Sequence, residues 1–286
     1  MSYSKAPTTK MIFLLKAKPG MSREAFIERY ETKHAPLALQ IIPYMCEYRR
    51  TFLPQEGMLS VSHVGDAAQR PEFDVVTELW FEDQAALDAM FADMADSNKG
   101  ELIAQDELDQ FDRSKLILMT ADEYVTPAEL LMPPPSPDAV PAIKMVCFMR
   151  RRPGMTREEF IDYYETGHAV LAQKILTDEQ GRCVFGQYRR SFPVPGTVTQ
   201  FGEEGAAPYA WDFDVMTEIW YWTAEDYERF HACTQMPEVA VPLSEDEAKV
   251  FDMKFTTMFI GDEYISTPAQ CAAALKALKA REAAVA

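Results

Sequence analysis

The sequence contains an internal repeat that spans most of its length. Lys10-Met11 recurs as Lys144-Met145, which sets an offset of 134 residues (144 − 10 = 134). Tyr48-Arg49-Arg50 recurs as Tyr188-Arg189-Arg190 at an offset of 140 (188 − 48 = 140), because the second copy holds about six extra residues near Thr177 to Arg182. Self-similarity of this kind constrains a fold more than any other pattern in a single sequence. We therefore expect two copies of one structural unit.

Each copy shows the same predicted order of strands and helices. A short apolar run from Met11 to Lys16 ends near a Pro-Gly turn and predicts a strand, and Ser22 or its counterpart Thr156 is a typical helix cap. Residues 49–52, 73–81 and 115–119 predict three further strands, with a second helix after Asp83. The order βαββαβ is typical of a ferredoxin-like module. We therefore predict an α+β fold in which two tandem ferredoxin-like modules form an intramolecular α+β barrel.

Prolines indicate the boundary between the copies. They cluster between residues 127 and 141, where they prevent regular structure and stiffen a connection. We predict a first domain at 1–126, a proline-rich linker at 127–141, a second domain at 142–266 and an alanine-rich helix at 267–286. A loop of nearly twenty residues after Phe52 is long for a compact domain, and we interpret it as a lid.

Composition excludes several classes of partner. The net charge of −17 would repel nucleic acid and an anionic membrane surface. No apolar run approaches the length of a membrane span, and the five cysteines form no Cys-x-x-Cys pair. We expect a globular cytoplasmic protein that acts as an internal pseudo-dimer, and the sequence leaves open whether it forms a homodimer as well.

A histidine recurs at the same place in both copies and is the main candidate for catalysis. Tyr30 and His34, like Tyr164 and His168, are spaced by four residues and should share one face of the first helix. A histidine can take and return a proton near neutral pH, and the tyrosine could assist it. The alternative is that both residues only pack at the edge of the hydrophobic core and have no catalytic role. His63 and His231 have no counterpart in the other copy, and we expect no role for them.

Arginines and aromatic residues on the strands are the candidates for substrate binding. Neighbouring residues of a strand point to opposite faces, so one arginine of each pair should point inward and could hold a carboxylate or phenolate. The tryptophans could form the wall of a pocket for an aromatic ligand. The predicted substrate-binding residues are Tyr48, Arg49, Arg50 and Trp80, with Tyr188, Arg189, Arg190 and Trp220. The alternative is that the arginines lie in solvent or pair with Asp74 or Glu78.

The sequence predicts neither a metal site nor a cofactor. Glu31-x-x-His34 and Glu165-x-x-His168 resemble half of a di-iron site, but such sites lie in four long helices with two further glutamates. No zinc spacing, phosphate loop or dinucleotide fingerprint occurs. Heme with a histidine ligand stays an alternative.

The first copy resembles the EthD-domain family. The resemblance lies in Pro-Gly-Met-Ser-Arg-Glu-x-Phe at residues 19–26, then Tyr30, then His34-Ala35-Pro36-Leu37. The second copy departs from the motif at Gly167 and Val170. The resemblance implies a dimeric α+β barrel encoded among enzymes that degrade aromatic compounds or ethers or tailor polyketides, with either lyase chemistry or oxidation that needs no evident cofactor.

These patterns favour an enzyme that moves protons on a small aromatic or phenolic substrate. The first hypothesis is a cofactor-independent lyase with His34 as the base, which would catalyse dehydration, decarboxylation or cleavage of a C–C or C–O bond. The second is a cofactor-independent monooxygenase or other oxidoreductase, in which the same base produces an anion that reacts with dioxygen. The third is a barrel that binds a small molecule without turnover.

Overall fold

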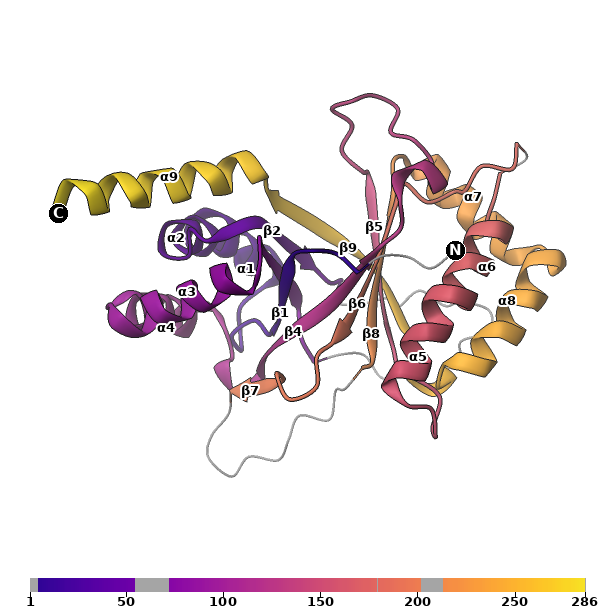
Figure 1. The fold of residues 1–286 in the computed structure, drawn as a ribbon, viewed down its shortest axis with the longest axis horizontal. Helices are drawn as coiled ribbons and strands as arrows, with labels where there is room; N and C mark the ends of the chain where they lie inside the picture. Colours follow the sequence, from indigo (N-terminus) through magenta and orange to yellow (C-terminus); the bar gives the residue numbers. More distant parts are fainter. Residues whose placement is uncertain (1–4, 55–71, 179, 202–212, 286) are drawn as a thin grey trace.

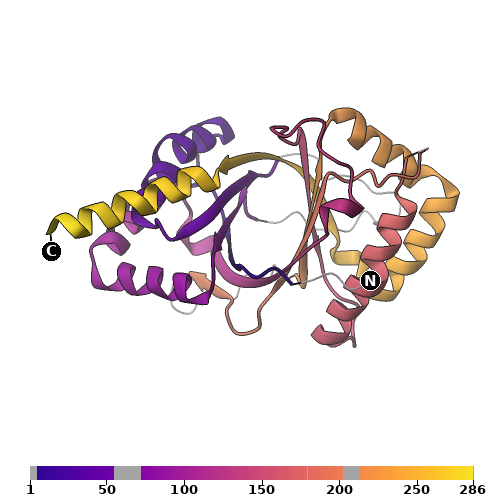
Figure 2. The same cartoon turned by 45° about the horizontal axis from the view of Figure 1, so that its top comes forward.

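The computed structural model describes residues 5–54, 72–178, 180–201 and 213–285. Within these ranges nine strands form one antiparallel sheet in the order β1-β3-β2-β9-β5-β8-β6-β4-β7. Because β1 also pairs with β4, eight of these strands close into a barrel. Figures 1 and 2 show the barrel between two groups of helices. The predicted lid after Phe52 and the histidine at position 63 lie largely or wholly outside the described residues.

Both halves use the same order of elements, except that the second half adds the short strand β7 and the final helix α9. The first half contains β1 (Thr9–Leu15), α1 (Arg23–Arg29), α2 (Ala35–Ile41), β2 (Met45–Phe52), β3 (Val75–Phe81), α3 (Gln84–Asp96), α4 (Lys99–Gln110) and β4 (Leu116–Val125). The second half contains β5 (Ile143–Met149), α5 (Arg157–Tyr163), α6 (Ala169–Ile175), β6 (Gln187–Pro193), β7 (Thr199–Phe201), β8 (Val215–Tyr221), α7 (Ala224–Gln235), α8 (Pro237–Val250), β9 (Thr257–Ser266) and α9 (Pro268–Val285). None of the described helices is both long and apolar enough to cross a membrane.

The predicted helix starts are confirmed. The Ser22 side chain accepts a hydrogen bond from the amide of Ala25, and Thr156 forms a complete capping box with Glu159. Gly20 and Gly154, which close the Pro-Gly turns, have φ angles of 86° and 90°, a region that favours glycine. The predicted second helix is instead a pair, α3 with α4 and α7 with α8.

The fourth strand of each half is longer than predicted, and it joins the two halves. Residues 117–121 of β4 pair with β1, and residues 121–125 pair with β6 of the other half. Strand β9 likewise pairs with β5 and with β2. The predicted strand ended near Met119, because the acidic run that follows in the sequence lacks apolar alternation. The sheet is therefore continuous through both halves.

Both faces of the barrel strands are buried, because one faces the helices and the other faces the barrel interior. Every residue of β3 is buried, although the sequence alternates apolar and polar side chains. Apolar clusters form between sheet and helices in each half, around Phe26 and around Phe160. A third cluster, which includes Ile12, Phe148 and Phe259, fills part of the barrel interior with side chains from both halves.

The rest of the barrel interior holds a buried charge network. Lys10 lies 2.6 Å from Glu78, 3.0 Å from Glu123 and 2.8 Å from Glu218. Its counterpart Lys144 lies 2.6 to 2.9 Å from Glu78, Glu218 and Glu263. Each lysine thus contacts carboxylates from both halves, and burial without these partners would be very costly for either charge.

Lys10→Met should destabilise the protein strongly, because it leaves three buried glutamates without this cation. We expect the free energy of unfolding in urea to fall by about 3–5 kcal/mol. The control is Lys5→Met, which removes an exposed lysine paired with the partly exposed Asp122 and should cost at most about 1 kcal/mol. Equal losses in the two variants would contradict the role assigned to the network.

The network should also make stability depend on pH. Burial and the neighbouring Glu218 raise the pKa of Glu78 from 4.5 to about 7. A carboxyl group whose pKa is raised by folding stabilises the folded state fully at low pH, and this contribution is lost as the pH rises through the folded pKa. Glu78→Gln should therefore flatten the fall in unfolding free energy between about pH 4.5 and about pH 7. Parallel profiles for wild type and variant would show that Glu78 does not titrate in this window.

Candidate active site

A π-helical turn in each half brings the predicted tyrosine and histidine toward the sheet. The turns are Tyr30–His34, between α1 and α2, and Tyr164–His168, between α5 and α6. Their four side chains are buried. Single π-turns within α-helices occur often at functional sites. The rings of Tyr30 and His34 lie edge to face at 4.7 Å, and those of Tyr164 and His168 at 4.9 Å.

Each histidine is held by an aspartate from the helix pair above the sheet. His34 Nδ1 lies 2.7 Å from Asp106 Oδ2 on α4, and His168 Nδ1 lies 2.8 Å from Asp246 Oδ2 on α8. The hydrogen bond with His34 lowers the pKa of Asp106. For Asp246, burial opposes the change, but hydrogen bonds with His168 and Tyr163 lower the pKa. A carboxylate on Nδ1 orients the imidazole and leaves Nε2 for a substrate.

The surroundings of the two aspartates differ. Asp106 accepts hydrogen bonds from the Arg29 guanidinium at 3.0 Å and the Gln110 amide at 3.1 Å. Asp246 accepts instead from the neutral Tyr163 hydroxyl at 2.7 Å. The carboxylate behind His34 is therefore hydrogen-bonded to a cation. The carboxylate behind His168 is hydrogen-bonded to a phenol, and the Lys249 cation acts on it only through its charge.

The buried tyrosines remain neutral phenols. Tyr30 shares a hydrogen bond of 2.7 Å with Thr77, and the Tyr48 hydroxyl donates to Tyr30 at 3.2 Å. Tyr164, Thr217 and Tyr188 form the same chain in the second half. Burial raises the pKa of both Tyr30 and Tyr164 well above the usual value. These hydroxyls can donate or relay a hydrogen bond, but they do not serve as bases near neutral pH.

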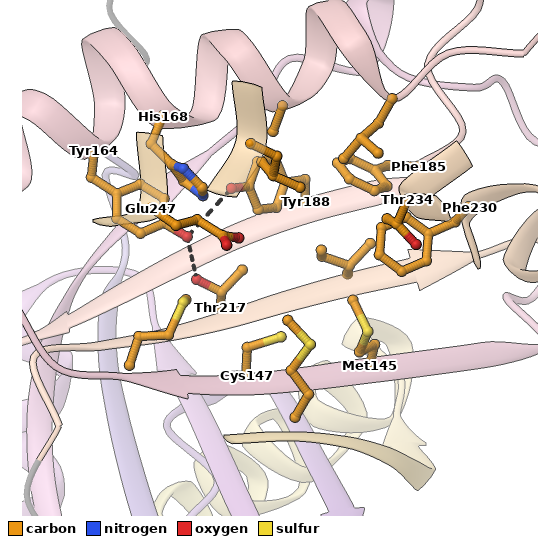
Figure 3. Close-up of a pocket in the computed structure, with 16 residues that line it drawn as sticks. Met145, Cys147, Tyr164, His168, Phe185, Tyr188, Thr217, Phe230, Thr234 and Glu247 are labelled. Atoms are coloured by element: carbon orange, nitrogen blue, oxygen red, sulfur yellow. Dashed lines mark hydrogen bonds between the residues drawn. The ribbon is translucent and has the colours of Figure 1, made fainter. Parts of the chain in front are cut away.

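An apolar pocket lies between helices and sheet beside each histidine. Figure 3 shows the second pocket, where His168 and Glu247 lie above Cys147 and Met145 of β5. Each cavity measures about 50 Å³, far less than the roughly 300–1,000 Å³ of most ligand sites. The second pocket has Cys147 at the position of Phe13 in the first pocket, and three methionines line it. Because methionine side chains are flexible, the wall of the second pocket can rearrange around a ligand more easily.

The predicted site residues fall into two separate places. Tyr48 and Tyr188 line the pockets beside the histidines. Arg50 and Arg190 point to the same face but form ion pairs with Glu31 and Glu165 on the π-turns. These pairs account for the two glutamates of the Glu-x-x-His motifs without a metal.

Arg49, Arg189, Trp80 and Trp220 lie on the opposite face of the strands, at the barrel interior. Arg49 forms ion pairs with Glu47 and Glu263. The alternative considered from the sequence was a pair with Asp74 or Glu78. The indoles of Trp80 and Trp220 donate to Glu123 and Glu263 of the charge network. Strand alternation therefore places these four residues on the other face of the sheet from the histidines.

Sequence reasoning missed the residues that the second helix pair contributes. Asp106-Glu107 recurs as Asp246-Glu247 at the offset of 140, and both glutamates line the pockets. This recurrence was the available signal, but no spacing rule connects a helix residue to a histidine more than seventy positions away. Burial raises the pKa of Glu107, which lies 3.3 Å from Arg113.

One protein family matches both copies of this arrangement. A model of the EthD domain matches residues 18–113 and 152–254, which include both histidines and both aspartates. The chain belongs to the EthD-domain family. The resemblance noted in the first copy is thus confirmed, and the EthD match extends to the second copy despite Gly167 and Val170. No curated protein matches the sequence.

Two solved structures share the fold of this EthD chain. One is a candidate monooxygenase from Lactobacillus acidophilus, with 10% identity, a TM-score of 0.50, and coverage of 91% of this chain and 96% of that one. The other is a candidate monooxygenase from Fusobacterium nucleatum, with 6% identity, a TM-score of 0.50, and coverage of 91% and 94%. At this identity the likeness concerns the fold alone.

Asp246→Asn should disturb the histidine that it orients. In the wild type we expect one fixed tautomer of His168, because the carboxylate accepts from Nδ1–H. The amide can donate as well as accept, so the variant should show a changed tautomer or exchange between two. Two-bond ¹⁵N correlation spectra of the ring can measure this. Asp262→Asn, at a side chain that is 63% exposed, is the control. An unchanged His168 spectrum in Asp246→Asn would contradict the assigned contact.

Proposed function

We propose that this EthD chain is an enzyme that removes a proton from a small phenolic or enolisable aromatic substrate. The observation that carries the proposal is the buried His168–Asp246 pair at the wall of an apolar pocket, beside the Tyr164 hydroxyl. Desolvation strengthens the interaction of the carboxylate with an imidazolium, which favours proton transfer to Nε2. Tyr164 would hydrogen-bond to the anion that forms.

His168 is proposed as the principal base, in preference to His34. Asp246 has no guanidinium partner among the described residues, whereas Asp106 is bonded to Arg29 and Gln110 and so supports a protonated imidazole less. The second pocket also has the smaller Cys147 in place of Phe13. Both differences favour substrate access and deprotonation in the second half.

The reaction that we propose next is oxidation by dioxygen without a cofactor. A deprotonated aromatic methylene or phenol is electron-rich, and dioxygen is apolar and enters a pocket of this kind readily. For a methylene carbon the balance is R₂CH₂ + O₂ → R₂C=O + H₂O, in which one oxygen atom enters the product and the other is reduced to water. The shared fold with two candidate monooxygenases accords with this choice but does not decide it.

A lyase is the second candidate. The comparisons give no support for it, but Glu107 beside His34 is a buried carboxyl group with a raised pKa. Such a group could protonate a departing hydroxyl, as a dehydration requires.

For the fold, we propose that residues 1–126 and 142–266 are two ferredoxin-like domains joined by the linker at 127–141. The shared element order supports this, and the pairing of β4 and β9 with both halves explains why the sheet is continuous.

The functional test combines oxygen uptake with product analysis on a panel of phenols and of aromatic compounds with an acidic methylene. His168→Ala should lower turnover by about 10² to 10⁴-fold, and His34→Ala should lower it less. Oxygen consumed in step with product supports the oxidation. Product formed without oxygen loss would favour the lyase, and full turnover in the double histidine variant would reject both.

A further inference from the structure

A larger cavity lies outside both histidine pockets, at one end of the barrel. It measures about 440 Å³, within the range of small-molecule sites. One wall runs from Val125, the last residue of β4, to Pro134. The other wall is the start of β6 with Trp222, and Arg49 of β2 also lines the cavity. Hydrogen bonds fix both walls, since the Met132 amide donates to Phe185 and the Trp222 indole donates to the Met132 carbonyl. The cavity is therefore part of the folded barrel.

An arginine with unused hydrogen-bond donors lines this cavity. Arg189 lies 3.6 Å from Glu47 and 3.9 Å from Glu123, and both contacts are longer than a hydrogen bond. No hydrogen bond joins its guanidinium to a described residue. Its side chain is only 18% exposed. A guanidinium carries five N–H donors. Those of Arg189 are not among the buried unpaired atoms of the described residues, so they are accessible from the cavity. An acceptor from outside the chain would complete the coordination.

The repeat explains why this arginine differs from its counterpart. Arg49 donates to Glu47, two residues before it on the same strand, at 2.6 Å. At the equivalent place before Arg189 the sequence has Gln187, a neutral side chain that also lines the cavity. The second copy thus lacks the carboxylate that occupies the guanidinium in the first copy.

The space beside Arg189 is open because the two halves end differently. After β9, helix α9 packs onto β2, the strand that carries Arg49. After β4, a short turn and the proline-rich segment pass over β6 instead, and the space between them and β6 is the cavity. Gly186 contributes to its shape, because a Cβ at this position would lie 2.7 Å from the Trp222 indole nitrogen.

We propose that this cavity binds a small organic monocarboxylate, with the carboxylate on Arg189 and Gln187 and an apolar body along Leu131, Met132 and Trp222. A carboxylate matches the planar fork of a guanidinium. A dianion is disfavoured, because Glu47 and Glu123 lie within 4 Å of the same guanidinium. An inorganic anion would leave the apolar walls without a contact, so the ligand should carry an apolar group.

The test is isothermal titration calorimetry of the full chain with benzoate and hexanoate, and with benzamide as the neutral control. We expect one carboxylate site per chain and no benzamide binding. Arg189→Gln should weaken binding by at least about tenfold, the usual worth of a hydrogen bond to a charged group. Gln187→Glu should have a similar effect, because it supplies the carboxylate that Arg49 has in the first copy.

Two controls establish whether the acid binds in this cavity. Arg182→Gln removes an exposed arginine and should leave binding unchanged. Arg189→Gln loses no hydrogen bond to described residues and only two longer contacts with Glu47 and Glu123. Gln187→Glu changes a partly exposed side chain, so both cavity variants should fold, and thermal melting verifies this. The proposal is overturned if neither acid binds, if binding survives both Arg189→Gln and Gln187→Glu, or if only His168→Ala abolishes it.

Discussion

Two lysines in the centre of the barrel hold together carboxylates from both halves, and the rest of the structure depends on this contact. Lys10 and Lys144 share Glu78 and Glu218, and each also binds the glutamate on one of the long fourth strands. Without these partners, the free energy needed to remove the lysine charge from water would exceed what a single apolar contact contributes. The strands are therefore set in one register, and the sheet can support helices on its outer face in each half.

The sequence predicts much of this fold because its signals are local or repeated. The Pro-Gly turns, the caps at Ser22 and Thr156, and the alternation along residues 73–81 each depend on neighbouring residues. Strand alternation places Arg49 and Arg50 on opposite faces and predicts that one of them lies in solvent, yet both are buried. It cannot tell that both faces are enclosed, because the cover comes from strands more than a hundred residues away.

The candidate site is less accessible to sequence reasoning for the same reason. The repeated Tyr and His identify one wall of each pocket, but Asp106 and Asp246 reach the histidines only through the packing of α4 and α8. The π-helical turns shift the ring positions in a way that helical spacing does not show. The tryptophans seemed suited to an aromatic substrate, yet their indole N–H groups satisfy buried glutamates, a demand visible only when the charge network is known.

The presence of both halves in one chain has a consequence for how the protein can evolve. In a symmetric homodimer every substitution occurs at two places at once, so a change that improves one site alters its twin as well. Here Cys147 corresponds to Phe13, and Gln187 corresponds to Glu47, as independent choices at equivalent positions. One half can therefore conserve the contacts that keep the barrel closed while the other acquires new ligands. Covalent fusion converts a duplicated architecture into two sites that selection can treat separately.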